Sequence, residues 1–187
     1  MKNERLSIVN ENDEVIGEED RSVIHRDGLL HREIHVWFLT PDKKLIFQKR
    51  GLDKETYPGL LDATVGGHVD IGESYEQAAV REAVEETGVT LSVGDLVFLK
   101  NNQSKSYDEL TNTMNVCFRK IFAYVYSGDV KNLKLEDEGA LGFDTFSLDE
   151  MKNLSDEEKK KFIARFVTNE ALIFYQEMID KVNENQN

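Results

Sequence analysis

The sequence predicts an α/β fold in which helices cover both faces of a β-sheet. In IHVWFLT, residues 34–40, both alternating sets of side chains are largely apolar, as expected for a strand that is covered on both sides. A capped helix is predicted at SYEQAAVREAVEETG, residues 74–88, and the C-terminal third carries further helix starts. Strands come mainly first and helices mainly last, and no Pro/Gly/Ser-rich linker divides the chain.

Composition and charge limit the classes of protein. The 187 residues, 40% of them hydrophobic, suit one globular domain, and the formal net charge of −13 argues against a nucleic-acid polymer as the main partner. The one cysteine, Cys117, excludes an internal disulfide framework. No apolar run approaches the roughly 18 residues that span a bilayer, so we expect a cytoplasmic protein with no membrane partner.

The strand candidates are short segments that turn residues separate. Turns at residues 11–14 and 41–43 join two pairs of them, and a longer apolar segment follows the helix. In chain order, the predicted strands cover residues 5–10, 14–20, 34–40, 44–50 and 113–128.

The predicted helices have recognisable ends. Ser74 can cap the first helix, Gln77 completes a capping box, and Gly88 supplies the stop. Two further Ser-x-x-Glu starts, at Ser147 and Ser155, predict that the C-terminal third is mainly helical.

The central helix concentrates negative charge on one face. At 100° per residue, Glu82, Glu85 and Glu86 share an arc of about 100°. Like charges at this spacing cost several tenths of a kcal/mol per pair, whereas a bound divalent cation would reverse the sign. Carboxylate oxygens beside a cleft suit Mg²⁺, which usually bridges to substrate phosphates. The predicted packing face consists of Val80, Ala83, Val84 and Thr87, with Ala78 and Ala79 leaving the glutamate side free of bulk.

The surrounding residues follow the pattern G-x5-E-x7-R-E-U-x-E-E-x-G-U, where U is apolar. Its positions are occupied by Gly67, Glu73, Arg81, Glu82, Ala83, Glu85, Glu86, Gly88 and Val89. This looks like the Nudix box, so the chain resembles a Nudix hydrolase, with the small Ala83 as a mild departure. The resemblance implies an α/β/α sandwich with a mixed β-sheet. It also implies one Nudix domain over residues 1–187, with a core at about 5–152 and a C-terminal helical extension at about 153–182.

The resemblance also implies a metal site and a reaction. Glu82, Glu85 and Glu86 would hold one to three Mg²⁺ or Mn²⁺ ions, together with the backbone carbonyl of Gly67. Gly66 would permit the close backbone approach. The expected reaction is the attack of water on a diphosphate linked to another group, in a small-molecule substrate.

Other roles follow from the same resemblance. Arg81 and Glu73 would form an ion pair that orients the loop and the helix. The general base would come from the acidic loop LEDEGALG, with Glu138 as the candidate and Glu136 and Asp137 close behind. Glu138 could instead be a metal ligand, or the loop could have no role.

The stretch before the box resembles the branch of the superfamily that includes isopentenyl diphosphate isomerase. By that resemblance Arg50 and Lys54 would contact substrate phosphate, and Lys49 would assist. The alternative for these residues is a basic strand end exposed to solvent.

Isomerase activity is the second-ranked function. That isomerase needs a cysteine where this chain has Gly66, and Cys117 is expected to be only a small buried residue. The isomerase also places a metal on histidines; His68 matches one of them, and His25 and His31 lie in the right region. Their spacing differs, so each is expected to be exposed or to have its hydrogen bonds satisfied.

Two further alternatives concern turnover and assembly. A Nudix domain can serve as a ligand sensor without turnover, but such domains commonly lose the metal glutamates that this chain keeps. Apolar residues between Phe162 and Met178 are more numerous than a lone surface helix should expose. They would either pack onto the sandwich or form a homodimer interface.

Overall fold

The computed structural model describes residues 4–54, 56–108, 111–135 and 140–185. The strands are β1 (Arg5–Val9), β2 (Val15–Asp20), β3 (His31–Leu39), β4 (Leu45–Arg50), β5 (Leu61–Asp62), β6 (Val65–His68), β7 (Val97–Asp108), β8 (Thr113–Val125) and β9 (Ala140–Phe146). The helices are α1 (Arg21–Asp27), α2 (Tyr75–Thr87), α3 (Leu148–Lys152), α4 (Asp156–Lys159) and α5 (Asn169–Asn185).

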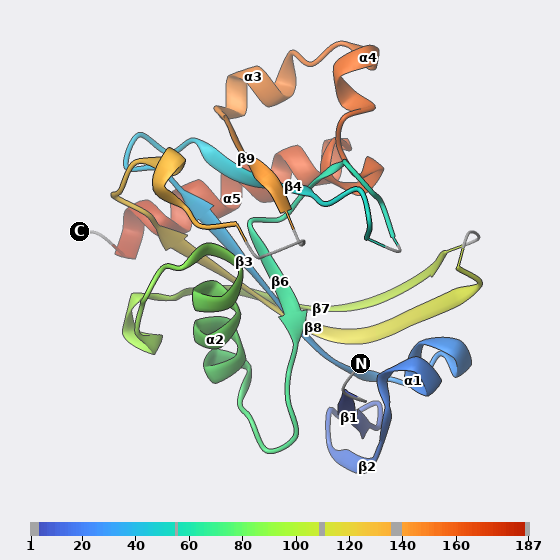
Figure 1. Cartoon of the computed structure of the whole chain (residues 1–187). Helices are drawn as coiled ribbons and strands as arrows, with labels where there is room; N and C mark the ends of the chain where they lie inside the picture. Colours follow the sequence, from blue (N-terminus) through green and yellow to red (C-terminus); the bar gives the residue numbers. More distant parts are fainter. Residues whose placement is uncertain (1–3, 55, 109–110, 136–139, 186–187) are drawn as a thin grey trace.

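A mixed sheet forms the centre of the molecule (Figure 1). Its strands follow the order β5-β4-β3-β8-β7, with β6 also paired to β3 and β9 to β4. Strands β3 and β8 are parallel, in register from His31 opposite Cys117 to Leu39 opposite Val125, while the other pairs are antiparallel. Strands β1 and β2 form a separate two-stranded sheet. The predicted α/β fold with a mixed sheet is confirmed.

Helices cover the sheet on both faces, as the pattern of β3 predicts. Ile34, Val36 and Phe38 pack in one cluster with the apolar residues of α2. Trp37 and Leu39 pack in another cluster with residues of α5. Figure 1 shows α2 and α5 on opposite sides of the sheet. Because successive side chains of a strand point to opposite faces, one strand forms the middle of both cores.

On the side away from β8, strand β3 pairs with two different strands along its length. Its first half, Glu33–Val36, pairs with β6, and Phe38 and Leu39 pair with β4. Thr64 lies where they separate and is fully buried. Its hydroxyl accepts a hydrogen bond from the Phe38 N–H at 2.9 Å and donates one to the Ile46 carbonyl. This side chain satisfies backbone groups that the sheet leaves unpaired at the fork.

The packing face of α2 differs from the prediction. Val84 is 42% exposed, whereas Ala78 and Ala79 are fully buried in the core. Ala83 and Thr87 are buried as predicted. The helix therefore uses its small residues for the closest approach to the sheet, since an alanine face lets the helix backbone lie nearer to the strands than a valine face does.

Helix α1 and strands β5, β6 and β7 were not predicted, and one helix is shorter than expected. Helix α1 and strand β7 lie in polar segments whose side chains show neither helical nor alternating periodicity. After the start at Ser155, only the four residues of α4 are α-helical before the chain turns toward α5.

The apolar C-terminal residues pack onto the sandwich. Phe162, Ile163, Phe166 and Met178 belong to the core cluster that contains Trp37. Their burial therefore requires no second copy of the chain. None of the described helices has the length and apolar character that a membrane crossing requires.

Candidate active site

Helix α2 begins and ends at the predicted residues. The Ser74 hydroxyl accepts a hydrogen bond from the Gln77 N–H at 3.2 Å, and the Gln77 side chain accepts one from the Ser74 N–H at 2.8 Å. Gly88 follows the last turn with a φ of 69°, a left-handed conformation that favours glycine. These caps fix both ends of the helix that carries the glutamates.

Arg81 ties the loop before α2 to the helix. Its guanidinium donates two hydrogen bonds to Glu73, at 3.1 and 3.0 Å, and one to the carbonyl of His68 at 3.0 Å. It also donates to Glu82 at 2.7 Å and to Glu85 at 3.1 Å. The expected Arg81–Glu73 ion pair is present, and the arginine also balances two of the clustered carboxylates.

The Glu82 carboxylate packs against the backbone of Gly67. A Cβ atom at Gly67 would lie 2.1 Å from the Glu82 carboxyl carbon, so any side chain there would displace the glutamate. Burial raises the pKa of Glu82 to about 7, although the Arg81 guanidinium opposes this shift. Gly67 is therefore the glycine that the Glu82 side chain approaches, and the role of Gly66 in the approach of a metal stays a prediction. Gly66 is itself crowded, since its Cβ would lie 3.2 Å from the His35 ring.

The three glutamates differ in position. Glu82 and Glu86 line a cleft together with Gly67, and the Gln48 side chain donates a hydrogen bond to Glu86 at 3.0 Å. Glu85 is half exposed, with 54% of its side chain accessible, and is held by Arg81. Carboxylate oxygens beside a glycine backbone that a side chain cannot cover are a donor set that fits Mg²⁺ or Mn²⁺. The sequence did not identify Gln48, because its hydrogen bond to Glu86 depends on how α2 packs against β4.

A Glu82→Gln substitution is expected to stabilise the metal-free protein, and more so at pH 8 than at pH 5. The folded-state pKa of about 7 lies above the ordinary value of 4.5, so the folded protein is more stable with Glu82 protonated. The free energy of unfolding of the wild type therefore falls as the pH rises through 7, where Glu82 must ionise while it is buried. Glutamine does not ionise, so the gain should reach at most about 3 kcal/mol above pH 7. Urea unfolding in the presence of a chelator measures it. An equal gain at both pH values would contradict a buried, titrating Glu82.

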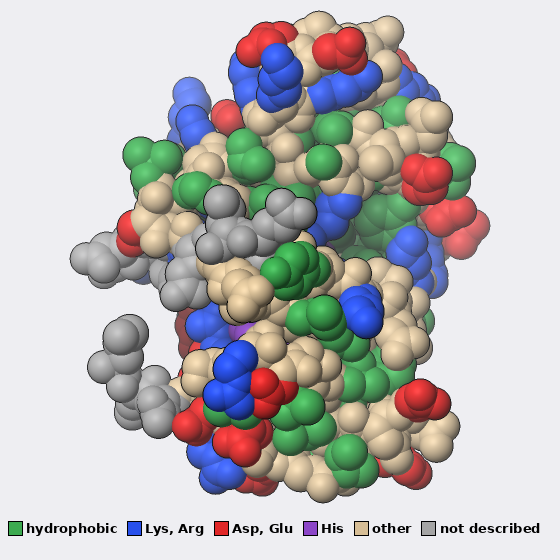
Figure 2. Space-filling view, turned by 90° about the vertical axis from the view of Figure 1, so that its right-hand side faces the viewer, with side chains coloured by type: hydrophobic (Ala, Val, Ile, Leu, Met, Phe, Trp, Pro, Cys, Tyr) green, Lys and Arg blue, Asp and Glu red, His purple; other side chains and the backbone are tan. Residues whose placement is uncertain are grey.

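Basic side chains line the same cleft as the glutamates. Arg50 and Lys54 are among its lining residues, and Figure 2 shows Lys and Arg side chains in and beside a hollow of the surface. Arg50 is anchored by Asp62 at 3.0 Å and by the Thr56 carbonyl at 2.9 Å. These contacts fix the position of its guanidinium in the lining of the cleft.

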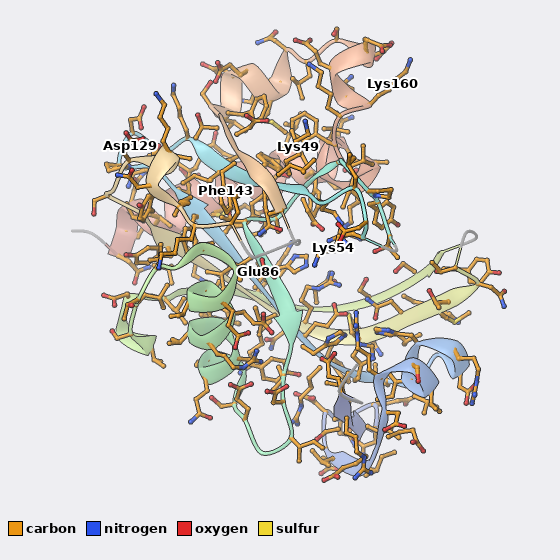
Figure 3. The ribbon with its side chains drawn as sticks, viewed as in Figure 1. Lys49, Lys54, Glu86, Asp129, Phe143 and Lys160 are labelled. Atoms are coloured by element: carbon orange, nitrogen blue, oxygen red, sulfur yellow. The ribbon has the colours of Figure 1, made fainter. Side chains whose placement is uncertain are left out.

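Lys49 does not belong to this lining. It is exposed and not among the lining residues, because it points to the other face of β4 from its neighbours Gln48 and Arg50. In Figure 3, Lys54 and Glu86 lie at the level of the cleft and Lys49 lies above them. The structure thus separates Lys49 from Arg50 and Lys54, with which it was grouped.

A buried ion pair forms the floor of the cleft. Arg119 of β8 donates to Glu33 of β3 through two guanidinium nitrogens, since the two residues are opposite each other in the parallel register. Burial would raise the pKa of Glu33, but the Arg119 charge holds it well below its usual value. Cys117 is buried as expected, and its thiol donates to Glu33 at 3.1 Å. Burial raises the pKa of this thiol.

The expectation for three of the histidines is wrong. His25, His31 and His68 are neither exposed nor satisfied: they lie together beside Glu33, and the Nε2 atom of each is buried without a hydrogen-bond partner. Burial, reinforced by the two neighbouring rings, lowers the pKa of His25 to about 4. The spacing of the histidines in the sequence was misleading because they come from three different elements.

The acidic candidates for the general base, Glu136, Asp137 and Glu138, lie outside the described residues. Ala140 pairs with Arg50 where β9 begins, which is beside the cleft. The assignment of the base to Glu138 stays a prediction.

Comparison with known proteins identifies the family. The model of the NUDIX domain matches residues 29–166. An uncharacterised Nudix hydrolase of Clostridium acetobutylicum is 29% identical over 159 residues, which are 83% of this chain and 76% of that protein. One of Streptomyces coelicolor is 42% identical over 87 residues, which are 46% of this chain and 48% of that protein, so the chain spans about half of it.

Solved structures share the fold. The protein DR0079 of Deinococcus radiodurans has a TM-score of 0.65 at 22% identity, covering 92% of this chain and 98% of that one. The NUDIX domain of Shewanella oneidensis NrtR, solved with ADP-ribose, has a TM-score of 0.52 at 15% identity, covering 84% and 88%. A mixed sheet between helices, with a glutamate-bearing helix at a cleft, is thus the Nudix fold. The chain belongs to the Nudix hydrolase family.

Proposed function

We propose that this protein is a Mg²⁺- or Mn²⁺-dependent hydrolase that cleaves the diphosphate bond of a small organic diphosphate. The observation that carries the proposal is one cleft that Glu82, Glu86 and Gly67 line together with Arg50 and Lys54. Oxygen ligands and phosphate-binding cations thus line the same cleft, as a metal-bridged diphosphate requires.

The residues of the site have three proposed roles: metal binding, positioning of the loop and phosphate binding. Glu82, Glu85, Glu86 and the Gly67 carbonyl would hold the metal, which when bound polarises the phosphoryl oxygens and lowers the pKa of water. Arg81 and Glu73 hold the loop before α2 in place against the helix. Arg50 and Lys54 bind the phosphate oxygens.

In the reaction, the water oxygen forms a bond to one phosphorus and the bridging P–O bond breaks. Each product then carries one of the phosphates, and the proton of water passes to a base for which Glu138 is the candidate.

A substrate panel tests the reaction class. ADP-ribose, which the Shewanella domain binds, nucleoside triphosphates, dinucleoside polyphosphates and isoprenoid diphosphates are incubated with Mg²⁺ or Mn²⁺. We expect metal-dependent cleavage of at least one of them, followed as a new phosphate product. Metal binding without turnover of any compound would instead favour the sensor alternative.

Isopentenyl diphosphate belongs in the panel because isomerase activity is the second candidate. Gly66 stands where the isomerase cysteine is expected, and the Cys117 thiol is buried and hydrogen-bonded to Glu33. We therefore expect no dimethylallyl diphosphate. A cytoplasmic location and a homodimer also remain proposals, and light scattering tests the latter.

A further inference from the structure

His35 is a nearly buried imidazole that lines the cleft. Its exposed fraction is 9%, and Gly66 and Gly67 lie with it among the lining residues. Neither of its ring nitrogens makes a hydrogen bond with a residue that the structure describes. A polar side chain buried to this extent usually has a partner. The unused nitrogens of His35 therefore require an explanation.

Glycine at position 66 keeps the His35 ring uncovered. The two residues are opposite each other in the antiparallel pairing of β3 and β6. A Cβ atom at Gly66 would lie 3.2 Å from the ring carbon Cδ2 of His35 and 3.4 Å from its Nε2 atom. Because Gly67 comes next on β6 and packs against Glu82, His35 lies beside the proposed metal site.

Arg165, in the segment between α4 and α5, lines the same cleft. Its guanidinium lies over the Phe166 ring, 4.8 Å from the centroid, and over the Tyr57 ring at 5.8 Å. Its Nη2 atom is 3.7 Å from an Asp62 oxygen, an ion pair that is too long for a hydrogen bond. Contacts with aromatic rings hold a guanidinium in place and leave the N–H donors at its edge for a ligand.

His35 and Arg165 are neighbours through Phe166. The ring centroids of His35 and Phe166 are 6.5 Å apart, and the Arg165 guanidinium lies over the same Phe166 ring. Burial, with the charges of Arg119 and Arg165, lowers the pKa of His35 well below its usual value. The ring is therefore neutral at pH 7 and can donate a hydrogen bond from one nitrogen. A neutral N–H donor beside a guanidinium suits an anionic group.

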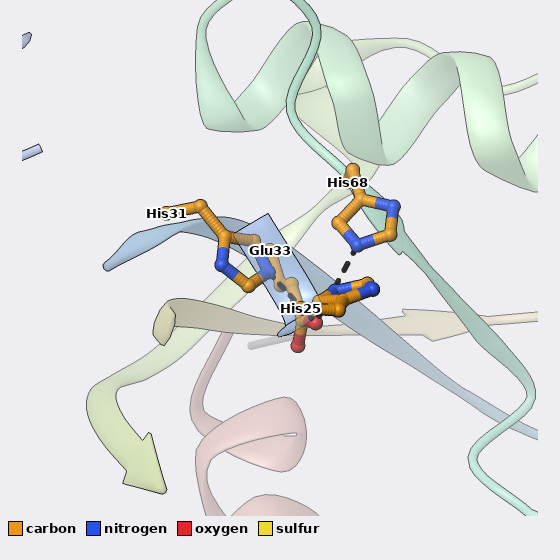
Figure 4. Close-up of side chains that lie close together, drawn as sticks. All are labelled: His25, His31, Glu33 and His68. Carbon is orange, nitrogen blue, oxygen red and sulfur yellow. Dashed lines mark ion pairs between the residues drawn. The ribbon is translucent and has the colours of Figure 1, made fainter. Parts of the chain in front are cut away.

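Two other arginines of the cleft already have carboxylate partners. Arg21 pairs with Glu4 at 3.6 Å. Arg119 donates to Glu33, which lies among the three histidines that Figure 4 shows. These contacts balance both arginine charges within the protein, whereas the Arg165 guanidinium makes no hydrogen bond with the described residues.

Arg50 and Arg165 share one carboxylate. Arg50 donates to the Oδ2 atom of Asp62 at 3.0 Å, whereas Arg165 approaches the Oδ1 atom. An anionic group that bridged both guanidinium groups would approach the Asp62 carboxylate and be repelled by it. The two arginines therefore suit two separate anionic groups, of which Arg50 would bind the diphosphate.

The rest of the lining is hydrophilic. Among the described lining residues the apolar side chains are those of Ile34 and Tyr57, and Ile34 is fully buried in the cluster that packs against α2. Ser106, Thr113 and Asn115 add hydroxyl and amide groups. A hydrocarbon chain would therefore bury little apolar surface in this cleft.

We propose that His35 and Arg165 form a subsite for a phosphate or carboxylate that the substrate carries in addition to its diphosphate. The substrate is then a hydrophilic organic diphosphate with one further anionic group, and isoprenoid diphosphates are poor substrates. This inference rests on the proposed function, since it takes the ligand of the cleft to be a diphosphate.

Two pairs of diphosphates that differ by one anionic group test the subsite. Coenzyme A carries one phosphate more than dephospho-coenzyme A, and UDP-glucuronate has a carboxylate where UDP-glucose has a hydroxymethyl group. We expect the wild type to prefer the anionic member of at least one pair by about 10-fold or more in kcat/KM, mainly through KM. The pair that shows the preference identifies the group as a phosphate or a carboxylate.

Variants of Arg165 test its part in the preference. Arg165→Gln should reduce the preference to about twofold or less and leave kcat for the uncharged member nearly unchanged. Arg165→Lys should retain part of it, because lysine keeps the charge and loses the planar fork. Arg26→Gln is the matched control and should keep the preference, because Arg26 pairs with Asp27 and does not line the cleft.

His35→Leu tests the second member of the subsite. The variant should lose about 10-fold of the preference, and its Tm should stay the same or rise, because an unpartnered buried imidazole is replaced by an apolar side chain. A lower Tm with an unchanged preference would exclude His35 from the subsite.

Binding without turnover separates this proposal from the hydrolase proposal. Calorimetry gives the Kd of each compound with Mg²⁺ for Glu86→Gln protein and for the Glu86→Gln/Arg165→Gln double variant. No hydrolysis by the wild type, together with a preference in Kd that depends on Arg165, would refute the hydrolase proposal alone. The subsite is overturned if the protein prefers the anionic member of neither pair, or if the preference survives Arg165→Gln.

Discussion

Glu86→Gln is expected to lower the rate of diphosphate hydrolysis by about 1,000-fold, which corresponds to about 4 kcal/mol of lost transition-state stabilisation. The substitution removes one anionic oxygen from the cleft but keeps the acceptor for the Gln48 hydrogen bond. Stability without metal should stay the same or rise, because repulsion within the cluster is relieved. Single-turnover kinetics at saturating metal and a thermal melt in chelator measure the two effects.

Glu76→Gln is the matched control. Glu76 lies on the same helix but pairs with Lys120 at 3.2 Å and does not line the cleft. The rate of this variant should stay within about twofold of wild type, since a partly exposed pair outside the cleft contributes about 1 kcal/mol or less. If Glu86→Gln instead kept its rate and lost stability without metal, the glutamate would have a structural role.

Arg81→Leu is expected to reduce both stability and activity, because this side chain makes five hydrogen bonds to the loop and the helix. Its loss leaves Glu73 and Glu82 without their main cation, at a cost of about 2–4 kcal/mol in the free energy of unfolding. Activity should fall at least 100-fold, since the His68 carbonyl and Glu82 lose their shared anchor. Urea unfolding and initial rates give both numbers.

The Glu73→Gln/Arg81→Leu double variant provides the control. If the arginine acts through Glu73, the combined loss of stability should be smaller than the sum of the single losses. Strict additivity would show that the loop and the helix are held together by other contacts.

Local signals were read correctly from the sequence. The caps of α2 at Ser74 and Gly88 depend on neighbours within four residues, and the two-sided burial of β3 depends only on alternation. Val84 shows the limit of such reasoning. Helical geometry groups the residues of α2 into faces. Which face lies closest to the sheet depends on the surface that the helix packs against, and here it is the face that carries Ala78 and Ala79.

The histidine cluster could not be predicted in the same way. A partial signal exists, because His31 and Glu33 are two residues apart on a strand and must therefore share a face. His25 belongs to a helix that has no clear periodicity, and His68 ends a strand of four residues. Their approach to Glu33 depends on pairing between strands, which no local pattern encodes.

The division of β3 between β4 and β6 has a consequence for the engineering of substrate preference. Thr64, directly before β6, is hydrogen-bonded to Phe38 of β3 and to Ile46 of β4, so it ties the start of β6 to both strands and opposes their separation beneath the cleft. Lys54 and Tyr57, by contrast, belong to the connection between β4 and β5, which lines the same cleft outside the regular strands. Grafting that connection from a relative would exchange this part of the cleft while the strands and the glutamates of α2 stay unchanged.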